Sequence, residues 1–330
     1  MTATELFDQF SRINVLIVGD VMIDRYISGE VNRISPEAPV PVVQWNGEED
    51  RLGGAANVAL NIKAMGATPY LCSVIGSDED GDRFLDLLPG QQLDPTGIAR
   101  SDMRPTTVKT RILAGKQQLL RIDHETVDPL NQAENELLIL KAMELLERKN
   151  IHVILFQDYN KGVLIPENIK KLLKEAHKRN LPTAVDPKFH NFWEFKGVTL
   201  FKPNLKEIRA QADMQVLPEL ASLTKTAAWI RSKLGNSNTM ITLSEKGLFL
   251  DDGHYSRLIP TQPRSIADVS GAGDTVIAVV ALGLAIGMPM DALGTLSNLA
   301  GGQVCEYLGV VPVNKNQLLK EFEELHPGPL

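Results

Sequence analysis

Short apolar runs alternate with amphipathic segments along most of this 330-residue chain, and no other feature limits its possible folds so strongly. The runs with the length and composition of buried strands are residues 15–18, 70–75, 153–156, 183–185, 199–201 and 240–243. Helical patterns lie between them, such as residues 167–179, which follow Pro166 and end before Pro182. Strands that alternate with helices form a mostly parallel sheet covered on both faces, so the predicted fold class is α/β.

Two early segments depart from this alternation. Residues 27–45 contain three prolines and no helical period, and residues 107–123 alternate in steps of two on either side of Gly115. We expect lid strands from about 25–45 and 105–123 to form a small separate β-sheet over the site. A surface hairpin that covers nothing is the alternative. Because the sequence shows no repeat or low-complexity tract, a single domain over residues 1–330 with this lid is expected.

The composition narrows the functional classes. A net charge of -7 argues against binding to nucleic acid or to an anionic membrane, although a local basic pocket can still bind a small anion. The most apolar stretch, residues 276–290, is short for a membrane span and is better explained as a core helix. The N-terminus has no secretory pattern, and Cys72 and Cys305 lie in apolar surroundings typical of reduced, buried thiols. These features predict a cytoplasmic protein.

The run Asp268-Val269-Ser270-Gly271-Ala272-Gly273-Asp274 directly precedes a long apolar helix. Small residues let backbone N–H groups converge at the helix start, where anions bind. An acid in a first helical turn is often only a dipole partner. A carboxylate beside an anion site also suits phosphoryl transfer, because it accepts the acceptor's proton while the amides stabilise the phosphoryl charge. The chain has no Walker-type loop, and Gly271-Ala272-Gly273 lacks the third glycine of a dinucleotide fingerprint.

Four motifs resemble those of the ribokinase-like (PfkB) carbohydrate kinases, in the family's order. They are Gly53-Gly54-Ala55-Ala56-Asn57, Lys202-Pro203-Asn204-Leu205-Lys206-Glu207, Thr242-Leu243-Ser244-Glu245-Lys246-Gly247 and Gly271-Ala272-Gly273-Asp274. They extend over nearly the whole chain, and the resemblance implies transfer of phosphate from ATP, with Mg²⁺, to a sugar hydroxyl.

A narrower resemblance is carried by residues 18–26, 33–43 and 158–162. These segments are similar to the D-glycero-β-D-manno-heptose 7-phosphate kinases, which phosphorylate the anomeric oxygen on the way to ADP-heptose, a precursor of the lipopolysaccharide core. The nucleotidyltransferase domain often fused to such kinases carries an H-x-G-H motif that this sequence lacks. We therefore expect a kinase without that domain, with a separate nucleotidyltransferase in the same pathway. The resemblance also implies a homodimer formed through the lid.

The resemblance assigns roles to individual residues. Asp274 is the expected general base, and Gly271, Ala272 and Gly273 form the anion hole. The expected nucleotide-binding residues are Asn204, Glu207, Thr242, Ser244, Gly247 and Asn298. Glu207 would organise Mg²⁺ through water, and Asp268 matches the family's monovalent-cation position, which K⁺ would occupy. The alternatives are a helix-capping pair for Asn204 and Glu207, an interior amide for Asn298 and an ordinary turn acid for Asp268.

On the sugar side, Asp24, Gly53, Gly54 and Asn57 match positions that bind hydroxyl groups. The candidates that would surround the substrate phosphate are Arg33, Arg111, Arg121, Asp158, Lys161 and Lys188, although any of the basic ones is alternatively a solvated surface charge. One rival function is a kinase of the same family that acts on ribose, fructose, fructose phosphate or a nucleoside. Another is a catalytically silent sugar-binding regulator, against which the intact Gly271-to-Asp274 run argues.

Overall fold

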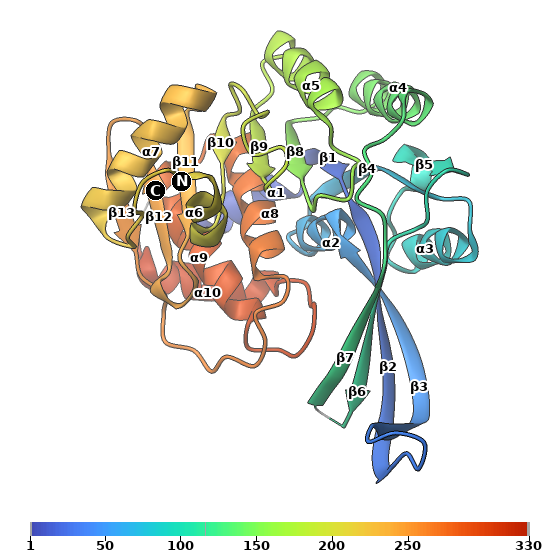
Figure 1. Cartoon of the computed structure of the whole chain (residues 1–330). Helices are drawn as coiled ribbons and strands as arrows, with labels where there is room; N and C mark the ends of the chain where they lie inside the picture. The colour runs from blue at the N-terminus through green and yellow to red at the C-terminus, as the bar shows by residue number, and fades with distance from the viewer. Residues whose placement is uncertain (1, 116, 329–330) are drawn as a thin grey trace.

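The main sheet is mostly parallel and, in this computed structural model of residues 2–115 and 117–328, contains nine strands in the order β13-β12-β11-β10-β9-β8-β1-β4-β5 (Figure 1). Only β12 and β13 pair antiparallel to their neighbours. The strands are β1 (Asn14–Gly19), β4 (Thr68–Gly76), β5 (Ile98–Ser101), β8 (Val153–Gln157), β9 (Thr183–Asp186), β10 (Leu200–Phe201), β11 (Asn238–Thr242), β12 (Leu248–Asp251) and β13 (Ser256–Ile259). Every predicted strand is present, and the α/β prediction is confirmed.

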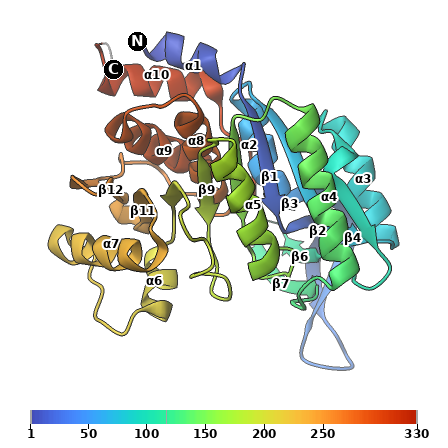
Figure 2. The same cartoon turned by 90° about the horizontal axis from the view of Figure 1, so that it is seen from above.

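Helices cover both faces of the sheet, as the apolar strands require. In β1, Val15 and Ile17 belong to one buried core while Leu16 and Val18 belong to the other. The first core includes side chains of α1 (Ala3–Phe10), α2 (Ala55–Ala64), α3 (Glu79–Gly90), α8 (Ala272–Ala285), α9 (Met290–Val304) and α10 (Lys315–Leu325). The second includes α4 (Gln132–Arg148), α5 (Pro166–Lys178), α6 (Leu205–Gln211) and α7 (Leu220–Leu234). Figure 2 shows α4 and α5 on the face opposite α8 and α9.

The long apolar helix of the sequence is α8, which packs against α2, α9 and the strands β8 and β9. Contact on several sides explains why its apolar residues are not confined to one stripe. Among the residues with described positions, no helix combines the length and the apolar character needed to cross a bilayer.

A second sheet projects from the main body (Figure 1). Its strands have the order β3-β2-β6-β7 and comprise β2 (Val21–Ile34), β3 (Pro41–Gly54), β6 (Val108–Ala114) and β7 (Gln117–His124). The predicted small separate sheet is therefore present, and its first strands extend further than predicted. The ends of β2 and β3 at Val21 and Gly54 are buried in the main body, whereas most residues toward their outer ends are exposed. We call these four strands the small sheet.

The strand order reverses at β1. From β1 the chain passes through the small sheet to β4 and β5 on one side, and it later returns to β8 and β9 on the other. In open α/β sheets, ligands bind outside the carboxyl ends of the strands at such a switch point. Asp20 directly follows β1 and Asp158 directly follows β8. The topology thus predicts a site beside these two positions.

Candidate active site

Asp274 lies in the first turn of α8 and is only 5% exposed. The Nδ2 atom of Asn57, on α2, donates a hydrogen bond of 2.8 Å to its Oδ2. Its Oδ1 accepts hydrogen bonds from the Tyr159 hydroxyl at 2.5 Å and from Gln157 Nε2 at 3.3 Å. Both oxygens are therefore held by neighbours from α2, β8 and the segment after β8. The carboxylate lies at the switch point of the sheet.

This environment adjusts the basicity of Asp274. Burial raises its pKa to about 6, although hydrogen bonds from Tyr159 and Asn57 act in the opposite direction. Asp186 adds to the increase, and Lys202 reduces it. A general base works best when its pKa is near the operating pH, and this carboxyl is mostly ionised at pH 7. The arrangement suits proton abstraction from a hydroxyl group.

The backbone beside Asp274 has the form of an anion site. Gly271 has φ of +79°, a left-handed conformation that glycine adopts without steric cost. A Cβ at Gly271 would lie 3.1 Å from Asn57 Nδ2, so a side chain here would crowd the residue that holds Asp274. The first-turn N–H groups of a helix have no intrahelical acceptors and favour bound anions. Gly271, Ala272 and Gly273 form the start of α8 beside Asp274, and their role as an anion hole remains a prediction.

Next to this helix start is a network of two lysines and two carboxylates, the buried Asp186 and the partly buried Glu207. Lys202 Nζ lies 3.1 Å from Asp186 Oδ2, and Lys188 pairs with both Asp186 and Glu207. Burial acts to raise the pKa of Asp186, but Lys188 and Lys202 outweigh it and keep that pKa below its usual range. Burial, followed by repulsion from Asp186, raises the pKa of Glu207. In this network the two carboxylates and the two lysines balance each other's charge beside the start of α8.

Asn204 and Glu207 form the capping pair that the sequence offered as an alternative. Asn204 Oδ1 accepts from the Glu207 N–H, and Glu207 Oε2 accepts from the Asn204 N–H, each at 2.8 Å. The other carboxylate oxygen of Glu207 accepts from Lys188. Carboxylate oxygens are the ligands that Mg²⁺ prefers, and Mg²⁺ usually retains several waters, so Glu207 fits the predicted water-mediated role. That role remains a prediction.

The other predicted nucleotide residues lie along the adjoining edge. The Thr242 N–H donates to the Pro203 carbonyl, which brings the end of β11 beside Asn204. Gly247 has φ of +92°, and a Cβ there would lie 2.0 Å from the Ile259 carbonyl oxygen. Asn298, on α9, donates to the Pro260 carbonyl at 2.7 Å. Between Thr242 and Gly247, Ser244 begins a 3₁₀ turn, Ser244–Lys246.

Both carboxylate oxygens of Asp268 accept hydrogen bonds from the protein. Its Oδ1 accepts from the N–H and the hydroxyl of Ser270, and its Oδ2 accepts from the Gly309 N–H at 3.0 Å. These contacts match an ordinary turn acid, and the monovalent-cation role remains a prediction.

The predicted hydroxyl-binding residues meet where the small sheet enters the main body. Asp24, on β2, is 4% exposed and accepts from Arg111 Nη1 of β6 at 2.6 Å. A Cβ at Gly53 would lie 2.3 Å from Asp24 Oδ2, and one at Gly54 would lie 2.5 Å from the Asp20 carbonyl oxygen. Because Gly54 directly precedes α2, the helix that carries Asn57, these positions adjoin the carboxylate of Asp274.

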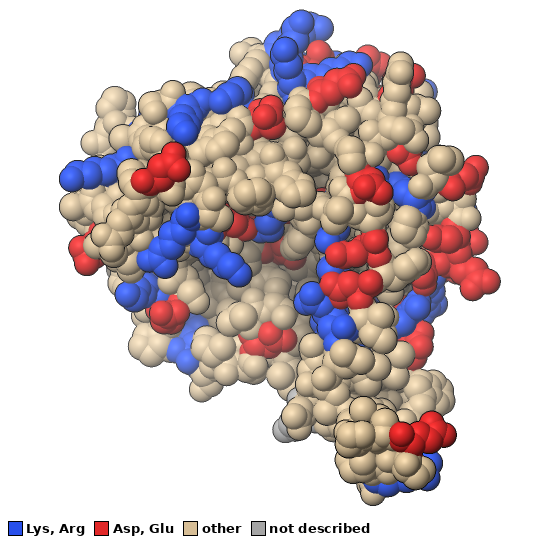
Figure 3. Space-filling view, viewed as in Figure 1, with Lys and Arg blue, Asp and Glu red and all other residues tan. Residues whose placement is uncertain are grey.

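The predicted basic residues separate into different environments. Lys161 Nζ lies 2.5 Å from Glu125, which also pairs with Lys109 at 2.8 Å. Arg121 is half-exposed and pairs with Asp123 on the same strand. Arg33 is exposed near the outer end of β2, roughly 30 Å along the strand from Asp24 at about 3.3 Å per residue. Figure 3 shows acidic and basic side chains around a hollow between the main body and the small sheet.

Lys188 and Asp158 have positions that differ from those of the lid cations. Lys188 is engaged with Glu207, on the side of the predicted nucleotide residues. Asp158 is 1% exposed, and its oxygens accept from the Asn160 N–H and from Asn191 Nδ2. Since its oxygens are engaged by these protein donors, its position favours a turn-stabilising role over contact with a substrate.

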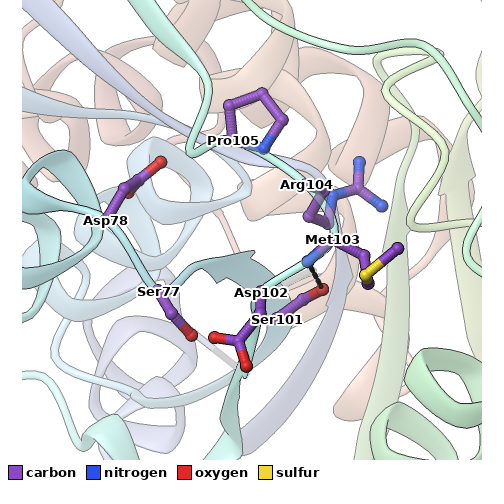
Figure 4. Close-up of a pocket in the computed structure, with 7 residues that line it drawn as sticks. All are labelled: Ser77, Asp78, Ser101, Asp102, Met103, Arg104 and Pro105. Carbon is purple, nitrogen blue, oxygen red and sulfur yellow. Dashed lines mark hydrogen bonds between the residues drawn. The ribbon is translucent and has the colours of Figure 1, made fainter.

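A further hollow of about 350 Å³ lies at the carboxyl ends of β4 and β5 (Figure 4). It is lined by Ser77, Asp78, Ser101, Asp102, Met103, Arg104 and Pro105. The guanidinium of Arg104 donates to the Lys161 carbonyl, so one wall of the hollow also supports the segment after β8.

Residues 12–316 match the sequence model of the pfkB family carbohydrate kinases, which spans most of the chain. The chain belongs to this family. It is a phosphotransferase that acts on sugars, as the four motifs predicted. At 38% identity over 326 residues, this pfkB kinase is similar to the bifunctional protein HldE of Geotalea uraniireducens (strain Rf4), and at 40% over 316 residues to that of Trichlorobacter lovleyi. The alignments cover 98% and 95% of this chain but 65% and 64% of those proteins, so the chain spans less than two thirds of their length.

Solved structures confirm the ribokinase-like fold. Phosphofructokinase-2 from Escherichia coli, in complex with potassium, superposes with a TM-score of 0.78 at 18% identity and covers 95% of this chain and 99% of its own. Ribokinase from Arabidopsis thaliana, complexed with ribose and ATP, has a TM-score of 0.71 at 18% identity and covers 93% and 98%. At such identities the likeness shows the shared architecture only.

Several residues around the site were not predicted from the sequence. Tyr159 and Gln157 contact Asp274, Lys202 pairs with Asp186, and Lys109 shares Glu125 with Lys161. The Asp158-to-Gly162 motif contained Tyr159, but its resemblance gave no role to the phenol. Lys109 and Arg111 are two residues apart on β6 and thus on the same face, which is the one signal that linked Lys109 to the site.

Proposed function

We propose that this pfkB kinase transfers the γ-phosphoryl group of ATP to O1 of D-glycero-β-D-manno-heptose 7-phosphate and forms the 1,7-bisphosphate for ADP-heptose biosynthesis. The observation that carries the chemistry is the buried Asp274 carboxylate beside the glycine-rich start of α8. The choice of sugar is supported by the two HldE relatives and by residues 158–162, which resemble heptose 7-phosphate kinases.

In this proposal Asp274 accepts the proton of the O1 hydroxyl as the oxygen attacks the γ-phosphorus. The N–H groups at Gly271, Ala272 and Gly273 stabilise charge on the transferring phosphoryl group. Glu207 would hold Mg²⁺ through waters, and the ion would neutralise charge on the triphosphate. The small sheet acts as a lid that excludes water, which would otherwise hydrolyse ATP. Positioning and electrostatics thus provide most of the rate acceleration.

The substrate phosphate would bind near the base of the small sheet. Lys161 and Lys109 both direct their ammonium groups to Glu125, and Lys109 also pairs with Asp123 at 2.9 Å. A phosphate group is a stronger partner for two lysines than one carboxylate, because it carries more charge and more acceptor oxygens. Arg111, held by Asp24, is the third cation of this region. Arg33 lies further out on the small sheet and would contact the sugar only through a larger rearrangement, whereas Arg121 is opposite Arg111 in the register of β6 and β7 and pairs with Asp123.

A substrate panel tests the proposal. Purified protein is supplied with Mg-ATP and one of several acceptors, and ADP formation is followed by a coupled assay with and without K⁺. We expect the highest kcat/KM with D-glycero-β-D-manno-heptose 7-phosphate, compared with ribose, fructose, fructose 6-phosphate and a nucleoside. Faster turnover of an unphosphorylated sugar or a nucleoside would overturn the heptose assignment, while still leaving a kinase.

Replacing Lys161 with methionine should raise KM for the phosphorylated sugar about tenfold and leave kcat within about threefold. The reason is the loss of one charge-assisted contact, which is worth roughly 1.5 kcal/mol. Lys171→Met, at an exposed position on α5, is the matched control. An unchanged KM in Lys161→Met, with the control also unchanged, would remove Lys161 from the phosphate site.

The proposal also includes the setting of the reaction. We place the enzyme in the cytoplasm, where ATP is supplied and where the free, buried Cys72 and Cys305 suit a reducing compartment. A homodimer through the small sheet is part of the proposal, because exposed apolar side chains occur on it, including Ile34, Val40, Trp45, Leu120 and Ile122. A separate nucleotidyltransferase in the same pathway would act downstream of the 1,7-bisphosphate product.

A further inference from the structure

Tyr159 is partly buried, and its hydroxyl donates to the carboxylate of Asp274 at 2.5 Å, the shortest of the three hydrogen bonds to that group. Burial, followed by the charge of Asp274, raises the pKa of the phenol well above its usual value, so the hydroxyl stays protonated and acts as a donor. A hydrogen-bond donor that contacts a carboxylate stabilises the ionised form of the carboxylate and fixes the orientation of its oxygens. Tyr159 therefore acts on the predicted base directly.

The backbone that carries Tyr159 is itself held in place. The carboxylate of Asp20, which follows β1, accepts from the N–H groups of Tyr159 at 2.7 Å, Lys161 at 3.2 Å and Val163 at 3.0 Å. Arg104 donates to the carbonyl of Lys161 from the opposite side. Asn160, between these residues, has φ of +54°, which gives the segment a defined tight turn. These four hydrogen bonds hold the backbone of residues 159–163, so the phenol of Tyr159 has little freedom to move.

We propose that Tyr159 is a positioning residue for Asp274: the Tyr159 hydroxyl orients the carboxylate and keeps it ionised, so that it can accept the proton of the sugar hydroxyl. The inference rests on the proposed role of Asp274 as general base. Asn57 holds the second oxygen, so the base is fixed from α2 and from the segment after β8. The arrangement leaves the acidic group oriented before the sugar binds.

Besides Tyr159, several charged groups influence the pKa of Asp274, and a test of Tyr159 has to leave them in place. Asp186 and Lys202 face it from β9 and from the residue after β10, and Lys188 and Asp24 lie near Tyr159. Burial and then Asp20 raise the pKa of Asp158, beside Tyr159, to about 7. All of these groups remain in Tyr159→Phe, which removes one hydroxyl and retains the ring that lies 5.7 Å from Lys188 Nζ.

The experiment is the pH dependence of kcat/KM in the wild-type protein and in Tyr159→Phe. In the wild type, kcat/KM should rise with pH as Asp274 ionises, and this rise is the acidic limb of the profile. Tyr159→Phe removes a hydrogen bond that stabilises the ionised carboxylate, so the acidic limb should move up by about one pH unit. Above the limb, the variant should approach the wild-type rate. Tyr255→Phe, at an exposed site, is the matched control and should keep the wild-type profile.

A purely structural role for Tyr159 predicts a different result. In that case Tyr159→Phe would lower kcat/KM by the same factor at every pH and would also lower Tm. An acidic limb at the same pH in the variant and the wild type would overturn the proposal. The acceptor is whichever sugar the wild-type protein phosphorylates, so a wrong heptose assignment does not affect the outcome. A second readout needs no turnover: the Asp274 carboxyl is titrated by ¹³C NMR, assigned with Asp274→Asn, and should show the same increase in pKa.

Discussion

Replacing Asp274 with asparagine should lower kcat roughly a thousandfold while ATP binding stays within about threefold of the wild-type value. Asparagine has nearly the same shape but cannot accept the proton of the sugar hydroxyl. Its carbonyl oxygen can still accept from Asn57, and its amide can donate to the Tyr159 oxygen, so only the longer hydrogen bond from Gln157 is lost. Coupled ADP detection measures kcat, and calorimetry measures ATP binding.

The control for this variant is Asp8→Asn, an exposed aspartate on α1. It makes the same chemical change away from the switch point and should leave turnover unchanged. Near-normal kcat in Asp274→Asn would exclude this carboxyl as the base. A loss of ATP binding together with a decrease in Tm would instead indicate that the substitution damages the fold. In that case the variant would not show that Asp274 acts in catalysis.

Replacing Gly54 with alanine should reduce the free energy of unfolding by about 3 kcal/mol and remove most of the activity. Gly54 has φ of +61° and ψ of -133°, a combination that is essentially restricted to glycine. The new Cβ would also lie 2.5 Å from the Asp20 carbonyl oxygen and 2.9 Å from Met22 Cε. Thermal unfolding should show a decrease in Tm of several degrees.

Gly90→Ala provides the matched comparison, because a Cβ at the end of α3 would meet no atom within 4 Å. Its Tm should remain equal to the wild-type value or rise slightly. A Tm for Gly54→Ala as high as that of Gly90→Ala would show that the backbone at Gly54 relaxes easily. The need for glycine at the start of α2 would then have to come from substrate contact alone.

The sequence predicted best what depends on short stretches of chain. Strand β1 was recognisable because its residues are buried on both faces and its sequence is uniformly apolar, and α5 because Ile169, Leu172, Leu173 and Ala176 recur at helical spacing. Gly271 and Asp274 lie within one local motif, so their proximity follows from helix geometry alone. The fold class and the family could therefore be predicted before any coordinates.

Contacts between distant segments were harder to predict. Tyr159 reaches Asp274 across 115 positions, and Asn57 reaches it across 217, because the strand order reverses between β1 and β8. Asn57 could be selected because its motif gave it a role, whereas the motif that contains Tyr159 gave no role to the phenol. The basic candidates shared a different difficulty, since charge alone does not reveal which carboxylate a lysine faces. Lys188 thus lies with Glu207 instead of with Lys161.

The continuity of β2 and β3 with the main body has a mechanical consequence. One strand begins immediately after Asp20, and the other ends immediately before α2, so the projecting strands and the groups around Asp274 share one backbone. A tilt of the small sheet would act as a lever whose short arm carries Asp24 and the first turn of α2. Binding of a sugar would in this way shift Asn57, and through Asn57 the carboxylate of Asp274. No separate hinge element would be needed.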